Sequence, residues 1–206
     1  MNNLKICILD YGSGNVGSAF NILSVLTERV VVSNRAEDIM SASHLVLPGV
    51  GAFGAAMKKI NEKLPVKLLK EEVLSKGKPF LGICVGMQVL ADKGFEFGEC
   101  QGLGWIAGQV KALDSHGLTL PHIGWNNIEI KNQIPLLDRL GEKPDFYFLH
   151  SFVFNVGDNA NIAARAEYGD KFNAVIFKDN IFGVQFHPEK SQKAGKILLQ
   201  NFINLR

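Results

Sequence analysis

Cysteine is scarce in this chain of 206 residues, and long apolar segments are absent. The three cysteines are widely spaced and odd in number, which excludes the disulfide framework of a small secreted protein. The longest predominantly apolar stretch, residues 79–91, has 13 residues, whereas a membrane-spanning helix needs about 20. Asp10 ends the first apolar run, so the hydrophobic segment of a signal peptide is not formed. We therefore expect no membrane segment and a cytoplasmic location.

Neither sign of charge dominates the composition. Lys and Arg number 22 against 20 Asp and Glu, and no basic run stands out, which argues against sequence-independent binding of nucleic acid. The five histidines show no metal-binding pattern such as H-E-x-x-H, and the chain has no paired C-x-x-C. We expect no metal ion, no organic cofactor and no nucleic-acid partner.

Strand-like and helix-like segments alternate in the first half of the chain. Short apolar runs predict strands at residues 5–10, 29–32, 44–47 and 79–83. Apolar residues at helical spacing predict helices near residues 16–26, 37–40, 65–77 and 85–91. This alternation predicts a parallel sheet with helical crossovers.

The second half contains closely spaced strand-like segments instead. They are residues 110–113, 128–130, 146–149, 162–166, 174–177 and 181–186. We expect them to add antiparallel strands to the parallel sheet. Ser191 is expected to cap a final helix. Because no linker or repeat separates the halves, the sequence predicts one mixed α/β domain over residues 1–206.

A glycine motif follows the first predicted strand. Gly12, Gly14 and Gly17 match the dinucleotide-binding pattern G-x-G-x-x-G. That pattern also requires an acidic residue about 20 positions later, where this chain has residues 32–34, Val-Ser-Asn. The next residue, Arg35, could instead meet a 2′-phosphate. The alternative is a tight glycine turn that lets the following helix pack closely.

A cysteine stands between two glycines where a buried strand is expected to become a helix. The sequence Gly82-Ile83-Cys84-Val85-Gly86 is the cysteine form of the nucleophile elbow G-x-S-x-G. Such a turn projects the sulfur from the carboxyl edge of the sheet. The helix N-terminus that follows favours a thiolate and offers N–H groups to an oxyanion. The alternative is a buried core cysteine, a common environment for an unpaired thiol.

A thiol nucleophile needs a base and an orienting group. His187 follows the last predicted strand, and Glu189 stands two residues later, on the same side of an extended chain. A surface His-Pro-Glu turn is the alternative. The loop Gly49–Gly51 follows the third predicted strand and reaches the same sheet edge as Cys84, where a glycine-rich backbone can turn an N–H toward a carbonyl oxygen.

Three segments match the motifs of one enzyme family in their order along the chain. They are Leu47–Gly51, Gly82–Gln88 and Gln185–Ser191. On these motifs the chain resembles the class I, or triad-type, glutamine amidotransferases. Within that class, three further segments resemble the glutaminase subunit of imidazole glycerol phosphate synthase: Asp10–Asn15, Pro121–Asn126 and Phe146–Ser151. The resemblance implies a flavodoxin-like α/β fold, a mixed sheet with a parallel core, antiparallel C-terminal strands and helices on both faces.

The resemblance also implies roles for individual residues. Cys84 would attack the side-chain amide of glutamine, His187 would act as base and then acid, and Glu189 would orient His187. The oxyanion hole would be formed by backbone N–H groups of Val50, Gly51 and Val85. Glutamine would be held by Gly49, Gln88, Ser151 and Phe152.

A partner chain follows from the same resemblance. Ammonia would pass to a (β/α)₈-barrel synthase subunit in a heterodimer, which would form imidazole glycerol phosphate and aminoimidazole carboxamide ribonucleotide in histidine biosynthesis. The surface facing that partner would include Gly14, Asn15, Pro121, Trp125, Asn126, Tyr147 and Lys190. The resemblance thereby explains the glycine motif after the first strand as a docking turn.

Three alternative functions differ in whether the chain produces ammonia and in where that ammonia goes. A paralogous subunit would supply ammonia for amidination of a surface-polysaccharide sugar. A free-standing cysteine hydrolase or peptidase would use the same scaffold, but Gln88 and the docking motifs argue against it. A non-catalytic binding module would keep the elbow, but the presence of Cys84, His187 and Glu189 together argues against that.

Overall fold

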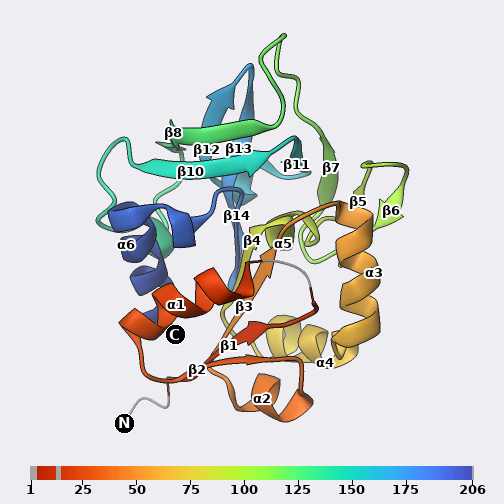
Figure 1. The fold of residues 1–206 in the computed structure, drawn as a ribbon, viewed down its shortest axis with the longest axis vertical. Helices are drawn as coiled ribbons and strands as arrows, with labels where there is room; N and C mark the ends of the chain where they lie inside the picture. The colour runs from red at the N-terminus through yellow and green to blue at the C-terminus, as the bar shows by residue number, and fades with distance from the viewer. Residues whose placement is uncertain (1–3, 13–14, 206) are drawn as a thin grey trace.

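A central eight-stranded sheet organises the molecule, as a computed structural model of residues 4–12 and 15–205 shows (Figure 1). Its parallel part has the order β2 (Val30–Ser33), β1 (Ile6–Leu9), β3 (His44–Gly49), β4 (Phe80–Cys84) and β14 (Ile181–Val184). The antiparallel strands β13 (Asp170–Lys178), β12 (Ile162–Tyr168) and β9 (Glu129–Ile130) continue it. The predicted mixed sheet is therefore confirmed.

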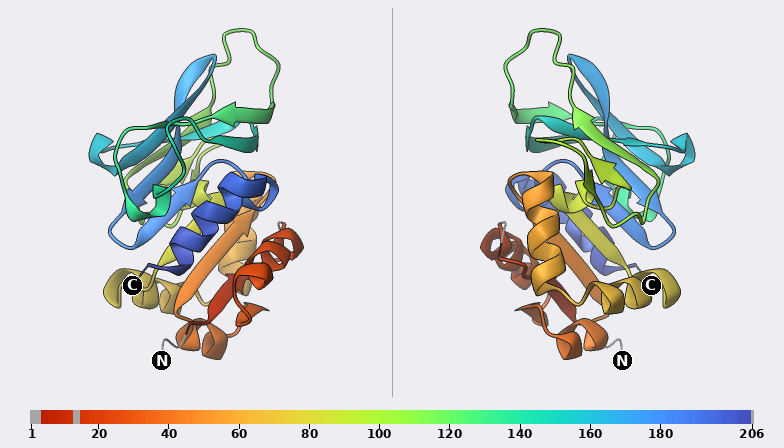
Figure 2. Two further views of the ribbon diagram at one scale, coloured as in Figure 1. Left: turned by 90° about the vertical axis from the view of Figure 1, so that its left-hand side faces the viewer. Right: turned by 90° about the vertical axis from the view of Figure 1, so that its right-hand side faces the viewer.

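Helices cover both faces of the parallel strands (Figure 2). One face carries α1 (Val16–Leu26) and α6 (Gln192–Ile203), and the other carries α3 (Phe53–Lys63) and α4 (Val66–Lys70). The helix α4 continues as a π-helix over Glu71–Ser75, and α2 (Ala36–Ser41) connects β2 to β3. Short 3₁₀ turns occupy Pro135–Leu137, Asn159–Asn161 and Pro188–Lys190.

Two smaller sheets lie beyond the carboxyl ends of the parallel strands, in the upper part of Figure 1. One pairs β8 (His122–Asn127) with β10 (Asp145–His150). The other has the order β11 (Phe152–Val156), β7 (Gly108–Ala112), β5 (Lys93–Gly94) and β6 (Cys100–Gln101). The edge where Cys84 ends β4 is thus enclosed by a second layer.

The structure corrects several predicted boundaries. The helix after Cys84, α5, spans only Val85–Gln88 and not residues 85–91. The backbone carbonyls of Val89, Leu90 and Ala91 instead accept hydrogen bonds from the loop of residues 103–106, which ends the helix. The helix α3 and the strands β8 and β11 were not predicted, although the buried residues of α3 lie at helical spacing. Within residues 4–12 and 15–205, no helix has the length and apolar character needed to cross a membrane.

Candidate active site

Cys84 stands on a sharp turn between β4 and α5. Its backbone has φ +55° and ψ −112°, a conformation that costs energy for any residue except glycine. A Cβ at Gly86 would lie 1.8 Å from the Leu47 carbonyl oxygen, and one at Gly82 would lie 2.4 Å from the Gly86 carbonyl oxygen. Only glycine fits at either position, so these two residues allow the backbone approach that the nucleophile turn needs.

His187 and Glu189 form a buried pair. The distance from His187 Nδ1 to Glu189 Oε1 is 2.8 Å, and their side chains are 2% and 1% exposed. The pair meets around the 3₁₀ turn Pro188–Lys190, so the expectation of an extended segment was wrong, although the two groups do come together. Among the described residues, His187 Nε2 is buried without a hydrogen-bond partner, which leaves it available to a reacting group.

The protonation of His187 reflects its neighbours. Burial by itself lowers the pKa of His187, but negative charge at the Cys84 sulfur and at the Glu189 carboxylate favours the imidazolium and raises that pKa to about 9. An imidazolium next to a cysteine stabilises the thiolate, which is the reactive form. The electrostatics of the site therefore suit a cysteine nucleophile.

Two further side chains hold this pair in place. Asn15 donates from Nδ2 to Glu189 Oε1 over 2.9 Å. Ser191 donates from Oγ to the His187 carbonyl over 2.6 Å and accepts from the Tyr147 N–H over 3.0 Å. Ser191 precedes α6 as predicted, but its side chain makes no capping bond to that helix. It joins the His187 segment to β10 instead.

A cavity of about 520 Å³ opens beside Cys84. Its lining includes eight of the predicted catalytic, oxyanion and substrate residues: Cys84, His187, Val50, Gly51, Val85, Gln88, Ser151 and Phe152. Gly49 lies next to Cys84 across the β3–β4 pairing, and Glu189 is reached through its bond to His187. The predicted catalytic, oxyanion and substrate residues therefore surround one pocket.

Several residues of this pocket were not predicted. Glu96, Phe97, Leu149 and His150 also line it. Glu96 is held there by the Phe53 N–H, which donates to its Oε2 over 2.8 Å. Leu149 and His150 lie within the motif segment Phe146–Ser151, but no role was given to them. Glu96 and Phe97 lie outside all of the matching motifs. They lie in the loop between β5 and β6, and the contact of this loop with the start of α3 brings it to the pocket.

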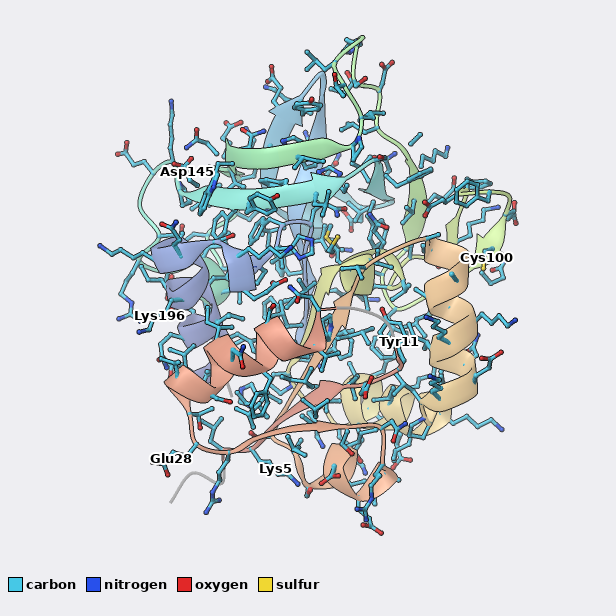
Figure 3. The ribbon with its side chains drawn as sticks, in the orientation of Figure 1. Lys5, Tyr11, Glu28, Cys100, Asp145 and Lys196 are labelled. Atoms are coloured by element: carbon cyan, nitrogen blue, oxygen red, sulfur yellow. The ribbon has the colours of Figure 1, made fainter. Side chains whose placement is uncertain are left out.

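The other two cysteines lie away from the pocket lining. Cys7 is fully buried in β1, where burial raises the pKa of its thiol to about 11. Cys100 is partly exposed beside α3, at the outer edge of the molecule (Figure 3). The structure therefore separates the turn thiol, Cys84, from one core thiol and one peripheral thiol.

Three of the expected partner-facing residues form a cluster on β10 and its neighbours. The ring centroids of Trp125 and Tyr147 lie 6.2 Å apart, and Lys190 Nζ lies 5.6 Å from the Tyr147 ring. Trp125 is 49% exposed, which is unusual for so large an apolar side chain. These three residues, called the aromatic cluster below, offer an exposed apolar contact beside a cation.

The remaining expected partner-facing residues lie at separate places. Asn126 neighbours Trp125 on β8 and donates to the Glu167 carbonyl. Pro121 lines the pocket beside Cys84, and Asn15 contacts Glu189. Gly14 lies outside the described residues.

One group of possible metal ligands occurs in the described part of the chain. Asp114, His116 and Asp170 are exposed and close enough to share an ion. The two ring nitrogens of His116 face different carboxylates, Asp170 at 2.8 Å and Asp114 at 3.7 Å. The hydrogen bond to Asp170 and the charges of both carboxylates raise the pKa of His116. None of the three residues lines the pocket.

Known proteins resemble this chain over nearly its whole length. The family model described as glutamine amidotransferase class I matches residues 7–205. Imidazole glycerol phosphate synthase subunit HisH 1 of Campylobacter jejuni strain RM1221 is 45% identical over 201 residues, which is 97% of this chain and 100% of that protein. Subunit HisH of Zymomonas mobilis is 44% identical over 207 residues, which is 97% of this chain and 95% of that protein.

Solved structures show the same fold at lower identity. The structure of PurLQS from Thermotoga maritima has a TM-score of 0.76 and 19% identity, with 98% of each chain covered. A glutamine amidotransferase from Thermotoga maritima has a TM-score of 0.72 and 17% identity, with 98% of this chain and 97% of that chain covered. With the family match over nearly its whole length, the chain belongs to the class I glutamine amidotransferases.

Proposed function

We propose that this chain is the glutaminase subunit of an imidazole glycerol phosphate synthase and acts in histidine biosynthesis. The observation that carries this proposal is the arrangement of Cys84 and the His187–Glu189 pair at one pocket of about 520 Å³. The names of the relatives at 44–45% identity support the pathway. Glutamine is the substrate, and glutamate and ammonia are the products.

The reaction begins at the sulfur of Cys84. Its thiolate attacks the side-chain carbonyl carbon of glutamine, and the negative charge moves to the carbonyl oxygen. Backbone N–H groups of Val85 and of the Val50–Gly51 loop stabilise that oxyanion. The carbon–nitrogen bond then breaks, His187 gives its proton to the departing nitrogen, and ammonia leaves behind a glutamyl thioester.

Water completes the turnover. His187, now neutral, takes a proton from a water molecule that attacks the thioester carbon. The carbon–sulfur bond breaks, glutamate leaves, and the Cys84 thiolate and the His187 imidazolium are restored. Glu189 keeps the same ring orientation through both steps because its carboxylate accepts from His187 Nδ1 at 2.8 Å.

The pocket contains groups that suit the amino-acid end of glutamine. Glu96 supplies a carboxylate for the α-ammonium group, and the Phe53 N–H keeps this carboxylate in position. The Gln88 amide nitrogen already donates to the Phe152 carbonyl and to Gln185 Oε1, both over 3.0 Å. Any contact of Gln88 with glutamine would therefore be made through its Oε1.

The partner in this proposal is a (β/α)₈-barrel synthase subunit, and the complex is cytoplasmic. The aromatic cluster, Asn15, Pro121 and Asn126 would face this subunit. Two of these residues also reach the active site, because Asn15 bonds to Glu189 and Pro121 lines the pocket. Docking at this surface could thus change the triad and retain the ammonia that would otherwise escape to solvent.

The test is a glutaminase assay on the purified chain, alone and with the barrel subunit from the same organism. We expect slow hydrolysis alone and a rise of about 10²–10³-fold on addition of the barrel subunit with its nucleotide ligand, the range that one aligned oxyanion donor supplies. Trp125→Ala and Asn126→Ala should both reduce this rise, and Trp125→Ala should leave the basal rate unchanged. Full activity alone, unchanged by the barrel subunit, would instead indicate a free-standing cysteine hydrolase.

A further inference from the structure

Two buried histidines connect the β8–β10 sheet to the pocket. His122 on β8 lies opposite His150 on β10 in the strand register, and they are 3% and 6% exposed. His122 Nδ1 lies 3.2 Å from His150 Nε2, and His150 Nδ1 lies 3.1 Å from the Phe152 carbonyl oxygen. Neither histidine has a part in the reaction described above.

The chemistry of these groups sets the direction of each bond. A carbonyl oxygen only accepts, so His150 Nδ1 must carry a hydrogen. Burial lowers the pKa of His122 to about 4, and burial together with the neighbouring His122 lowers the pKa of His150 to about 3, so both rings are neutral near pH 7. A neutral imidazole has one N–H. His150 Nε2 is therefore an acceptor, and the hydrogen between the rings belongs to His122 Nδ1.

The same carbonyl oxygen begins a second set of bonds that ends at the nucleophile. The Phe152 carbonyl accepts from Gln88 Nε2, which also donates to Gln185 Oε1. Gln185 Nε2 in turn donates to Cys84 Sγ over 3.7 Å. The series of hydrogen bonds from His122 through His150, the Phe152 carbonyl, Gln88 and Gln185 to Cys84 is called the bond chain below. Gln88 is 3% exposed and Gln185 is fully buried, so both amides are largely removed from bulk water.

We propose that His122 and His150 are positioning residues for glutamine hydrolysis. They fix the position of the Phe152 carbonyl oxygen, which holds the Gln88 amide. The Gln88 amide in turn orients the Gln185 amide so that its N–H points at the Cys84 sulfur. A donor at this sulfur favours the thiolate. The consequence for catalysis rests on the function proposed above.

A packing role for His122 is the alternative that an experiment must separate. Its ring stacks on Tyr168 with a centroid distance of 4.1 Å and on Phe148 at 5.1 Å. His122→Phe keeps a ring for this stacking and removes the Nδ1–H donor. His122→Asn removes the ring and keeps an N–H donor near the position of Nδ1. His122→Phe therefore keeps the packing and loses the hydrogen bond, whereas His122→Asn loses the packing and keeps the hydrogen bond.

The first measurement uses the wild-type chain and needs no turnover. In nitrogen-15 NMR of histidine-labelled protein, His122 and His150 should both carry hydrogen on Nδ1, and neither should titrate between pH 5 and pH 8. A hydrogen on Nε2 of either ring, or a charged ring in this range, would overturn the proposal. This outcome stays decisive even if His122→Phe does not fold.

The second measurement follows Cys84 in a Cys100→Ser background, as the rate of alkylation by iodoacetamide against pH. With His122→Phe, we expect the profile to move to higher pH and kcat/KM for glutamine to fall about two- to tenfold, the effect of one lost hydrogen bond. His122→Asn should stay within about twofold of the wild type. The opposite ranking would assign His122 to packing, and equal profiles in all three proteins would refute the bond chain.

The two proposals fail in distinguishable ways. If the wild-type complex does not hydrolyse glutamine, the proposed function is wrong, while the NMR and alkylation results still decide whether the bond chain exists. If the complex is active but both variants match it in kcat/KM and in alkylation, only the positioning role is wrong.

Discussion

The Cys84 turn and the segment His187–Ser191 both present catalytic side chains, but different forces hold them. The turn depends on contacts between neighbouring backbones, because Gly86 packs directly against the Leu47 carbonyl. The His187 segment depends on hydrogen bonds from remote elements, namely the Asn15 side chain at the start of α1 and the Tyr147 backbone N–H of β10. The nucleophile is thus placed by close backbone packing inside the parallel sheet, whereas the base is placed by hydrogen bonds to elements at the surface of that sheet, which a docked partner can change.

Removal of the nucleophile should have the largest effect. Cys84→Ala should lower glutamine-dependent synthesis by the complex by at least about 10³-fold, because no other side chain can form the thioester. Synthesis from added ammonium salt should persist, because that route does not use the triad. Cys100→Ser is the matched control and should behave as the wild type. Glutamine hydrolysis by Cys84→Ala would rule out this nucleophile.

The base and its orienting group should differ in importance. His187→Asn should cost more activity than Glu189→Gln, because the imidazole moves protons while the carboxylate orients and stabilises it. Both losses should reach at least about 10²-fold in kcat, the lower range for acid–base catalysis. Single-turnover measurement of thioester formation would compare the two variants. Wild-type activity in His187→Asn would remove this residue from the mechanism.

A methyl group at Gly86 should test the backbone packing that shapes the turn. The added Cβ would meet the Leu47 carbonyl oxygen at 1.8 Å, so the backbone must shift. Gly86→Ala should therefore reduce the free energy of unfolding by about 1–3 kcal/mol, the usual cost of overpacking. Denaturant titration measures this loss. Gly117→Ala is the control, because Gly117 lies at an exposed turn and also has a positive φ, 87°, but has space around the new Cβ. This substitution should cost less stability. An equal loss in the two variants would contradict the packing argument.

The remote support of Glu189 should give a smaller effect. Asn15→Ala removes the donor to Glu189 Oε1, and one hydrogen bond to a charged group corresponds to roughly ten- to hundredfold at most. Because His187 still bonds to the same oxygen, we expect a fall in kcat of about three- to tenfold with KM little changed. A rise in KM alone would assign Asn15 to substrate binding instead.

The pH dependence of stability should reveal the charge on His187. Its folded-state pKa of about 9 exceeds the ordinary value of 6.5, so the imidazolium stabilises the fold fully below pH 6.5 and loses this effect as the pH rises through 9. Glu189→Gln removes part of the cause. The free energy of unfolding should differ between the two proteins by about 1–2 kcal/mol at pH 6, and the difference should shrink by pH 10. A difference that grows with pH would have the wrong sign.

The parts of the site that are local in sequence were predictable. The glycine-flanked Cys84, the loop Gly49–Gly51 and the nearby pair His187 and Glu189 all have short signatures. Two further pocket residues were not, because Glu96, between β5 and β6, and His150, at the end of β10, come to the pocket only when these segments pack beside the parallel sheet. The helix α3 was missed even though Phe53, Ala56, Met57 and Ile60 carry the helical pattern.

Ser191 shows a different limit of sequence reasoning. Its type and its place before α6 are typical of a capping residue, yet its hydroxyl bonds to the His187 carbonyl and the Tyr147 N–H. The hydroxyl group has two possible sets of hydrogen-bond partners, and only the packing of distant strands decides between them. Local propensity thus predicted where the helix begins and not what the side chain does.

The bond between Asn15 and Glu189 has a thermodynamic consequence. It joins an expected docking residue to the triad over 2.9 Å, across 174 positions of sequence. If a docked subunit and bound glutamine prefer the same arrangement of this pair, each strengthens the binding of the other. The two affinities must rise by the same factor, because coupling between two binding events is reciprocal. The affinity of the two subunits for each other would then report on the occupancy of the glutamine pocket.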